Sequence, residues 1–270
     1  MTRAVAVAVM LLVAGSASGQ WLGYPAKNIP RSADGTPNLS APAPRTASGR
    51  PDLSGIWQPT SDPNDTAGGI EGIVAPKYLI DIMRDLKGAV PFQPWAAKLY
   101  QERQANKLRD NPMIRCLPAG VPRLDAYTHP YKIVQTPDLI VILYESQTMF
   151  RQIFTDGRMH PTDPEPSWLG YSVGRWDGDT LVVETIGFNG QTWLDGSGHP
   201  HSDAMKLTER FRRHDFGHMD IDITIDDHKA YTKPIRYVQP QILQPDTELI
   251  EYICNENAKP VGQSTVKPVP

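Results

Sequence analysis

The pentapeptide His199-Pro200-His201-Ser202-Asp203 carries the densest group of potentially reactive side chains in the chain. Alternate residues of an extended segment project to the same side, so His199 and His201 could bind one divalent metal ion together. One of three residues elsewhere could complete the metal site: His160, Asp195 or Glu209. This divalent metal is the alternative to the metal-free site that we expect.

The metal-free interpretation assigns proton transfer to His160 and His201, because imidazole titrates near neutral pH. Asp195 would orient one of the two rings. Ser202 directly follows His201 and is badly placed for a nucleophile triad, and the chain has no G-x-S-x-G motif. We therefore expect His160, His201 and Asp195 to act without a cofactor.

Two glutamates lie on the apparently apolar faces of predicted strands. Glu184 and Glu209 each have apolar neighbours two residues away on both sides, and so has Arg151. Inward carboxylates in different environments could divide acid and base roles, and we assign both to the catalytic group. The alternative is a buried Arg–Glu network that closes the barrel.

Two long loops, 156–170 and 188–203, bring histidine, asparagine and aromatic residues together between strands. Connections of this length are usually functional or disordered, and their Trp and Pro content argues against disorder. We predict that both loops lie at one end of the barrel. The predicted substrate-binding residues are Trp168, Tyr171, Trp193, Asn189 and Arg151. The alternative is that the rings only plug the barrel end.

The elements that must position these residues are mainly β-strands, because the hydrophobic period is two from Tyr131 onward. Strands are predicted at 131–135, 139–145, 148–155, 171–176, 180–187, 206–214, 219–226, 230–238 and 247–254. We predict an antiparallel meander of eight or nine strands, closed into a lipocalin-like barrel because closure hides the sheet edges. A two-layered sandwich is the alternative.

Before the barrel, a Pro- and Gly-rich arm contains a repeat with an offset of 14 residues, in which 30–40 recurs as 44–54. Trp57 follows the second copy and would anchor the arm. Short helices are predicted at 77–87 and 95–109, the first stopping at a glycine. The predicted division of the chain is a signal peptide (1–19), the arm (20–75), a helical segment (76–112), the β-barrel (113–257) and a flexible tail (258–270).

The amino-terminal 19 residues have a positive start, a short apolar stretch and a small-residue exit, as in a secretory signal peptide. Export and an even cysteine count predict one disulfide, between Cys116 and Cys254. No further apolar segment is long enough to cross a membrane. The net charge of -3 at pH 7 and the lack of a basic run give no support to nucleic-acid binding. The expected location is periplasmic or secreted.

Two sequence patterns point to a family. Arg175-Trp176-Asp177-Gly178-Asp179-Thr180-Leu181-Val182-Val183-Glu184-Thr185, followed by Gly187-Phe188-Asn189, is one, and Pro51-Asp52-Leu53-Ser54-Gly55-Ile56-Trp57 is the other. Together they resemble an uncharacterised family of secreted bacterial proteins, over most of the mature chain. The resemblance implies an exported single domain and no particular reaction.

These observations predict an exported enzyme that performs metal-free acid–base chemistry on a small cyclic, aromatic or sugar-like substrate. The reaction class, whether lyase, isomerase or hydrolase, stays open. The first alternative is a non-catalytic barrel that binds a small apolar or aromatic ligand. The second is a divalent-metal enzyme centred on His199 and His201. No nucleotide-binding, zinc-protease or haem-attachment motif is present.

Overall fold

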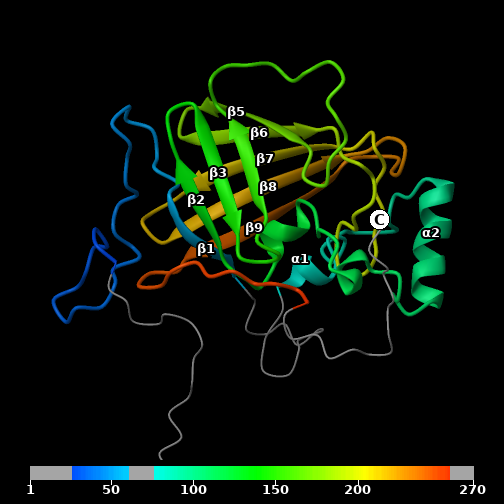
Figure 1. Ribbon diagram of the computed structural model, residues 1–270, viewed down its shortest axis with the longest axis horizontal. Coiled ribbons are helices and arrows are strands. Elements are labelled where there is room, and N and C mark those ends of the chain that lie inside the picture. Colours follow the sequence, from blue (N-terminus) through cyan, green and yellow to red (C-terminus); the bar gives the residue numbers. More distant parts are fainter. Residues whose placement is uncertain (1–25, 61–75, 256–270) are drawn as a thin grey trace, which may run out of the picture.

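Nine strands form a closed β-barrel in the computed structural model, which describes residues 26–60 and 76–255. Figure 1 shows the barrel with the helices gathered at one end. The strands are β1 (Gly55–Pro59), β2 (Tyr131–Gln135), β3 (Leu139–Tyr144), β4 (Phe150–Phe154), β5 (Tyr171–Asp177), β6 (Thr180–Ile186), β7 (Lys206–Arg213), β8 (His218–Asp226) and β9 (Ile235–Leu243). The helices are α1 (Lys77–Ile80), α2 (Pro94–Ala105) and the 3-10 turns η1 (Pro112–Arg115) and η2 (Arg123–Ala126).

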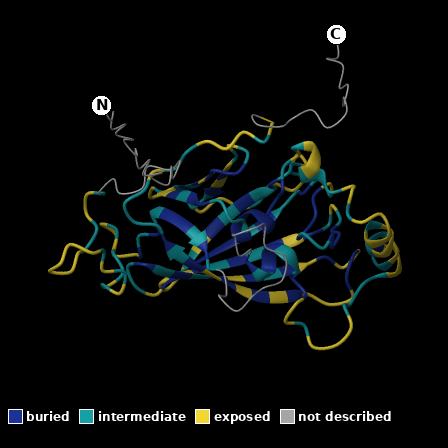
Figure 2. Cartoon of the chain, turned by 90° about the horizontal axis from the view of Figure 1, so that it is seen from below, coloured by how far each residue is buried: buried dark blue, intermediate teal, exposed yellow. Residues whose placement is uncertain are grey.

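The predicted mainly-β barrel is therefore confirmed, and the strands predicted between 131 and 226 agree with β2–β8 to within two residues at each end. Alternation of polar and apolar residues explains this agreement. Met219, Ile221, Ile223 and Ile225 of β8 are at most 1% exposed and fill the interior, while the intervening residues face outward. Figure 2 shows buried residues concentrated in the barrel and exposed ones along α2 and the outer loops.

One strand pair departs from the predicted antiparallel meander. β4 and β5 are parallel, and their pairing extends over Ile153–Ser172 and Phe154–Val173 alone. The chain between them, 155–170, therefore runs from one barrel end back to the other rather than reversing at a single end. The long loop predicted at 156–170 is this crossover, so the prediction that it lies with 188–203 at one barrel end is wrong.

The strand that closes the barrel comes from the end of the predicted arm. β1 pairs with β2 on one side and with β9 on the other, and Trp57 is completely buried with its indole N–H donated to the Leu53 carbonyl at 2.9 Å. The strand predicted at 247–254 does not form. The chain turns after β9, where Asp246 has a φ of 57°.

The two copies of the 14-residue repeat fold into matching turns. Arg31 bridges Pro37 in the first copy as Arg45 bridges Pro51 in the second. Each arginine also donates to the glycine carbonyl of its own turn, at 3.0 Å to Gly35 and 2.7 Å to Gly49.

The first helix is shorter than predicted because side-chain carboxylates accept the hydrogen bonds of the backbone amides that would continue it. α1 ends at Ile80, and Asp81 is extended. The next two amides donate to carboxylates instead of to helix carbonyls: Ile82 to Asp195 at 2.9 Å and Met83 to Asp81 at 2.8 Å. The predicted helix at 95–109 is observed as α2, which ends at Ala105. Among the described residues no helix has the length and apolar character needed to cross a bilayer.

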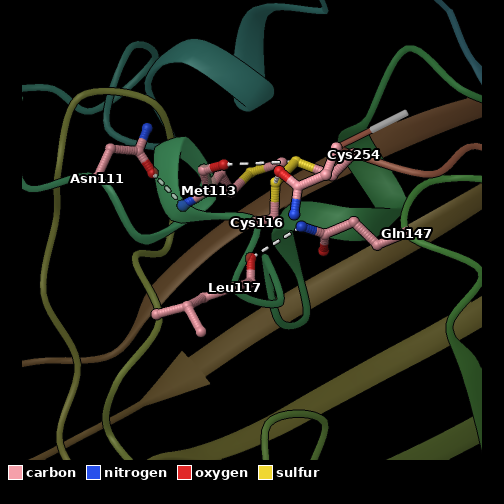
Figure 3. The surroundings of a disulfide bond; sticks show 7 residues. Asn111, Met113, Cys116, Leu117, Gln147 and Cys254 are labelled. Atoms are coloured by element: carbon pink, nitrogen blue, oxygen red, sulfur yellow. Dashed lines mark hydrogen bonds between the residues drawn. A yellow bond between two sulfur atoms is a disulfide. The ribbon is translucent and has the colours of Figure 1, made fainter. Parts of the chain in front are cut away.

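The predicted disulfide between Cys116 and Cys254 is confirmed, with the two Cα atoms 5.7 Å apart. Figure 3 shows the bond beside Met113 and Leu117, with the Gln147 amide donated to the Leu117 carbonyl at 2.9 Å. The bond joins the end of η1 to the segment after β9 rather than to a strand. It therefore ties the last described residues to the segment that precedes the barrel strands β2–β9.

Several predicted segments lie wholly or partly outside the described residues. They include the signal peptide at 1–19, the arm at 20–25 and 61–75, and the tail at 258–270.

Candidate active site

The barrel end at which β2 begins and β6 finishes is covered by residues 76–130, 187–205 and 227–234, here called the cap. Figure 1 shows α1 and the yellow 188–203 segment against this end, with α2 outside them. Within the cap, a bridge between Trp193 and Pro200 folds the 193–200 segment into a tight reversal. Gly198, with a φ of 88°, permits this reversal and brings His199 back over Asp195.

Asp195 and His199 form a buried hydrogen-bonded pair. Asp195 is 0% exposed and His199 is 1% exposed. His199 Nδ1 donates to Asp195 Oδ2 at 2.6 Å, and the His199 amide donates to Oδ1 at 3.2 Å. Because Oδ2 also accepts the Ile82 amide, the carboxylate is held from both sides. Asp195 therefore fixes the imidazole in the tautomer with its proton on Nδ1.

Aromatic rings enclose the His199 imidazole. It stacks on Tyr100 of α2 at 4.6 Å between centroids and on Phe92 at 5.6 Å. Burial, with the charges of Asp81 and Asp195 adding to it, raises the pKa of the Tyr100 hydroxyl. The second ring nitrogen, His199 Nε2, is buried and has no hydrogen-bond partner among the described residues. Nε2 is one of ten such side-chain atoms among the described residues, and it is distinguished by the carboxylate that is hydrogen-bonded to the other nitrogen of its ring.

Asp81 completes the one group of described residues whose donor atoms could surround a metal ion, together with Asp195 and His199. Asp81 Oδ1 lies 3.9 Å from His199 Nδ1. Two ligands of one zinc ion lie about 3 Å or more apart, because each bond is about 2.0–2.1 Å long. The 2.6 Å separation of Nδ1 and Asp195 Oδ2 is that of a hydrogen bond. These side chains therefore fit a proton-transfer site better than a metal centre.

His201 occupies a different environment from the one predicted. It is 4% exposed, and Nδ1 donates to the Ser202 carbonyl at 3.0 Å, which leaves Nε2 to accept from the Thr192 hydroxyl at 2.6 Å. Burial lowers the pKa of this imidazole, so its neutral form is favoured. Asp195 orients His199 and not His201. Both ring nitrogens of His201 are used in structural hydrogen bonds, which leaves none for a metal shared with His199.

The two glutamates predicted to face inward lie on opposite sides of the barrel wall. Glu209 is 0% exposed and forms a two-pronged ion pair with the Arg151 guanidinium, which also donates to Ser172 at 3.1 Å and Thr185 at 2.9 Å. This arrangement is the buried Arg–Glu network weighed as an alternative to catalysis.

The inward placement of Glu184 is wrong by one residue. Val183 and Thr185 face the interior, whereas Glu184 faces outward, 3.6 Å from both Arg175 and Lys206. Val182 on the outer face is also buried, so the apolar run 181–183 does not reveal which face is inside.

A third carboxyl, missed by the sequence reasoning, lies beside the Arg151–Glu209 pair. Asp125 of η2 is 0% exposed and accepts the Tyr144 hydroxyl at 2.9 Å. Burial, together with the charge of Glu209, raises the pKa of Asp125 well above its ordinary value. The protonated form of Asp125 is therefore favoured, and Glu209 is the carboxylate that pairs with Arg151. No periodic pattern surrounds Asp125 in the sequence, so alternation could not have found it.

Apart from Trp193, which lies in the same reversal, the other predicted site residues do not gather around Asp195. His160 on the crossover donates Nε2 to the Glu184 carbonyl at 2.9 Å, on the outer side of β6. Asn189 accepts the Gln191 amide in its own turn. Trp193 belongs to the cap and lies under the Arg103 guanidinium, 4.5 Å from its ring centre.

Trp168 and Tyr171 line a separate groove of about 340 Å³ over the parallel β4–β5 pair, with Phe150, Phe154 and Arg151. Phe150 is 63% exposed there.

Comparison of the chain with protein-family models, curated proteins and solved structures finds no match. The resemblance to secreted bacterial proteins stays a prediction.

Proposed function

We propose that the protein is an exported enzyme of acid–base chemistry, in which the Asp195–His199 pair transfers the proton. The observation that carries this proposal is the buried His199 imidazole, with Nδ1 donated to a carboxylate and Nε2 left without a partner. His199 therefore takes the proton-transfer role that the sequence pattern assigned to His201. A signal-like start and a disulfide support export, because disulfides persist in oxidising compartments.

The hydrogen bond to Asp195 gives the two ring nitrogens of His199 separate roles. With the proton held on Nδ1, the lone pair of Nε2 is the basic site and takes a proton from a substrate. Asp195 then stabilises the imidazolium that forms, and Nε2–H returns the proton as a general acid. This cycle serves a lyase, an isomerase or a hydrolase. Tyr100 and Phe92 stack on the His199 imidazole, and these aromatic surroundings favour a small cyclic substrate.

Access to Nε2 depends on α2, which carries Tyr100. This helix buries only Ala96 among its residues and is held to the 193–200 segment by its side chains. Arg103 donates to the Gly198 carbonyl at 2.8 Å and Gln104 to the Ser197 carbonyl at 2.6 Å. Displacement of α2 breaks few apolar contacts and uncovers the imidazole, so α2 acts as the cover of the site.

The first test locates the proton on His199. Nitrogen-15 NMR of the imidazole in the native protein should show the proton on Nδ1 in the neutral form of the ring, with Nε2 as an unprotonated nitrogen. A neutral ring protonated on Nε2 would contradict the proposed base.

The second test is turnover of a panel of small lactones, cyclic esters and hydroxylated rings, followed by mass spectrometry. His199→Gln and Asp195→Asn should abolish any turnover that the wild type shows. The matched control is His214→Gln, because His214 forms a comparable 2.7 Å contact with Asp220 on the surface. Turnover that survives His199→Gln in the folded variant would refute the assignment.

The groove over β4 and β5 favours a second function, binding of an apolar or aromatic ligand without catalysis. Its exposed Phe150 and the rings of Trp168 and Tyr171 line a space of about 340 Å³, which suits a small aromatic molecule. Phe150→Ala should weaken such binding and His199→Gln should leave it unchanged. Calorimetric titration with an aromatic probe such as naphthalene sulfonate distinguishes the two functions.

A further inference from the structure

A second pocket, here called the arm pocket, lies between the second repeat turn and the barrel end opposite the cap. It has a volume of about 880 Å³. The residues that matter for its chemistry come from the arm (Thr46, Ser48, Arg50), from the turn after β2 (Thr136) and from β5 (Arg175, Trp176). The space is within the range of small-molecule sites.

The arm turn that forms one wall is anchored to the barrel. Arg45 donates to both carboxylate oxygens of Asp179 at 3.0 and 2.6 Å, and it closes its own turn through the Gly49 carbonyl. The Thr46 amide donates to the Arg50 carbonyl at 2.8 Å, which completes the turn. The wall of the pocket is therefore a defined turn held against β5 and β6.

The turn that forms this wall differs from the turn of the first repeat copy in its polar side chains. In the first copy, Asp34 accepts the Thr36 amide at 3.0 Å and its hydroxyl at 2.7 Å, so the turn satisfies its own polar groups. The second copy has Ser48 and Arg50 at the same places, 14 residues later. The change removes an acid and adds a guanidinium that the turn itself does not use.

The Arg50 guanidinium lies 5.4 Å from the centre of the Trp176 ring and forms no hydrogen bond or ion pair with the described residues. Arg175 is the second cation of the pocket, and its side chain is 64% exposed with a single 3.6 Å contact to Glu184. No aspartate or glutamate lines the pocket. In a chain of net charge -3, the arm pocket is a local site of positive charge with free donors.

We propose that the arm pocket binds a small organic acid whose carboxylate is carried on a ring. Arg50 would pair with the carboxylate, because a guanidinium matches a carboxylate in a two-pronged geometry and Trp176 holds it in place. The Trp176 indole suits a flat ring, and the Ser48 hydroxyl, 2.9 Å from Thr46 Oγ1, can bond to a polar substituent of that ring. The Thr46 and Thr136 hydroxyls already donate to backbone carbonyls. Sugar acids and aromatic acids share this chemistry. The site lies at the opposite barrel end from His199 and does not depend on the proposed acid–base function.

Calorimetric titration of the full exported chain with two acids and their neutral counterparts tests the proposal. The probes are glucuronate against glucose, and 4-hydroxybenzoate against 4-hydroxybenzamide. At least one acid should bind, with its neutral counterpart weaker by about tenfold or more, because an ionised hydrogen bond is lost. Tighter binding of glucuronate assigns the pocket to saccharides, and tighter binding of 4-hydroxybenzoate assigns it to aromatic acids.

The chain itself supplies the matched variant. Arg50→Thr restores the residue of the first copy, which adopts the same turn, so the variant should fold. It should weaken binding of the acid by about tenfold or more, and Arg175→Gln should weaken it less. Arg236→Gln, on the outer face of β9, is the charge control and should bind as the wild type does.

Three results would overturn the proposal. One is that neither acid binds the wild type. Another is that each acid binds no better than its neutral counterpart. The last is that both Arg50→Thr and Arg175→Gln bind the acid as tightly as Arg236→Gln.

Discussion

Replacement of Glu209 by Gln tests the electrostatics of the barrel interior. The change keeps the shape of the side chain and removes the negative charge that pairs with Arg151. Both residues are at most 2% exposed, so water cannot replace the missing partner. The two hydrogen bonds from Arg151 to Ser172 and Thr185 remain, but neither hydroxyl carries charge.

The expected cost follows from the burial of the pair. Removing one partner of a buried ion pair destabilises a protein by about 3–5 kcal/mol, because the other charge is left uncompensated. Asp125 limits this loss in the single variant. Once the charge of Glu209 is gone, the Asp125 carboxyl can ionise and compensate Arg151. The variant that combines Glu209→Gln with Asp125→Asn removes this compensation, and it should show the full loss relative to the Asp125→Asn single variant.

Urea unfolding followed by circular dichroism measures the effect. With a denaturant dependence of about 2 kcal/mol per molar urea, a loss of 3–5 kcal/mol lowers the midpoint by about 1.5–2.5 M. Glu184→Gln is the matched control, since its carboxylate lies on the outer face with partners 3.6 Å away. Exposed pairs of this kind contribute about 0–1 kcal/mol.

Two outcomes would refute the reasoning. If the double variant unfolds within about 1 kcal/mol of the Asp125→Asn single variant, the interior does not depend on this charge pair. If Glu184→Gln costs as much as Glu209→Gln, the assignment of inner and outer faces on β6 and β7 is wrong.

Because burial raises the pKa of Asp125, the folded protein keeps a proton on this carboxyl that the unfolded chain releases. Asp125 therefore contributes stability at low pH, and this contribution is lost as the pH rises above 3.8, the ordinary pKa of the side chain. Asp125→Asn should fold well and gain stability relative to the wild type between low and neutral pH, as measured by thermal unfolding at a series of pH values. Replacing both cysteines with serine should cost about 2–4 kcal/mol in urea unfolding, and reduction of the wild type should match that loss. Gly120→Ala should lower the melting temperature, because φ is 74° and the new Cβ would lie 2.7 Å from the Thr192 hydroxyl. A cost of about 1–3 kcal/mol is expected, and an unchanged melting temperature would contradict the backbone argument.

The strands were predictable where polar and apolar residues alternate strictly, as in β8, because each face then has a single environment. Prediction failed where that condition is absent. In β6 the run 181–183 is buried on both faces, so the predicted inward and outward facing of its residues was wrong by one residue. The strand predicted at 230–238 is observed as β9 at 235–243, five residues later at each end, and Pro240 points outward and leaves the inward pattern intact.

The cap site could be predicted only in part. Asp195 and the 199–203 segment were identified from residue type and proximity in the chain. Which histidine Asp195 holds is decided by the reversal at Gly198, and the ring of Tyr100 arrives from a helix almost 100 residues earlier. Contacts over such distances in sequence leave no local pattern.

The parallel β4–β5 pair gives the barrel wall one place where the backbone ladder is short. Across it, the Arg151 side chain reaches from β4 to Ser172 on β5, to Thr185 on β6 and to Glu209 on β7. The Arg151 guanidinium thus links β4 to three successive strands, β5, β6 and β7, inside the barrel. The β4–β5 ladder has two paired positions, against three in each ladder of β1, and the Arg151 side chain supplements this shortest backbone connection of the wall.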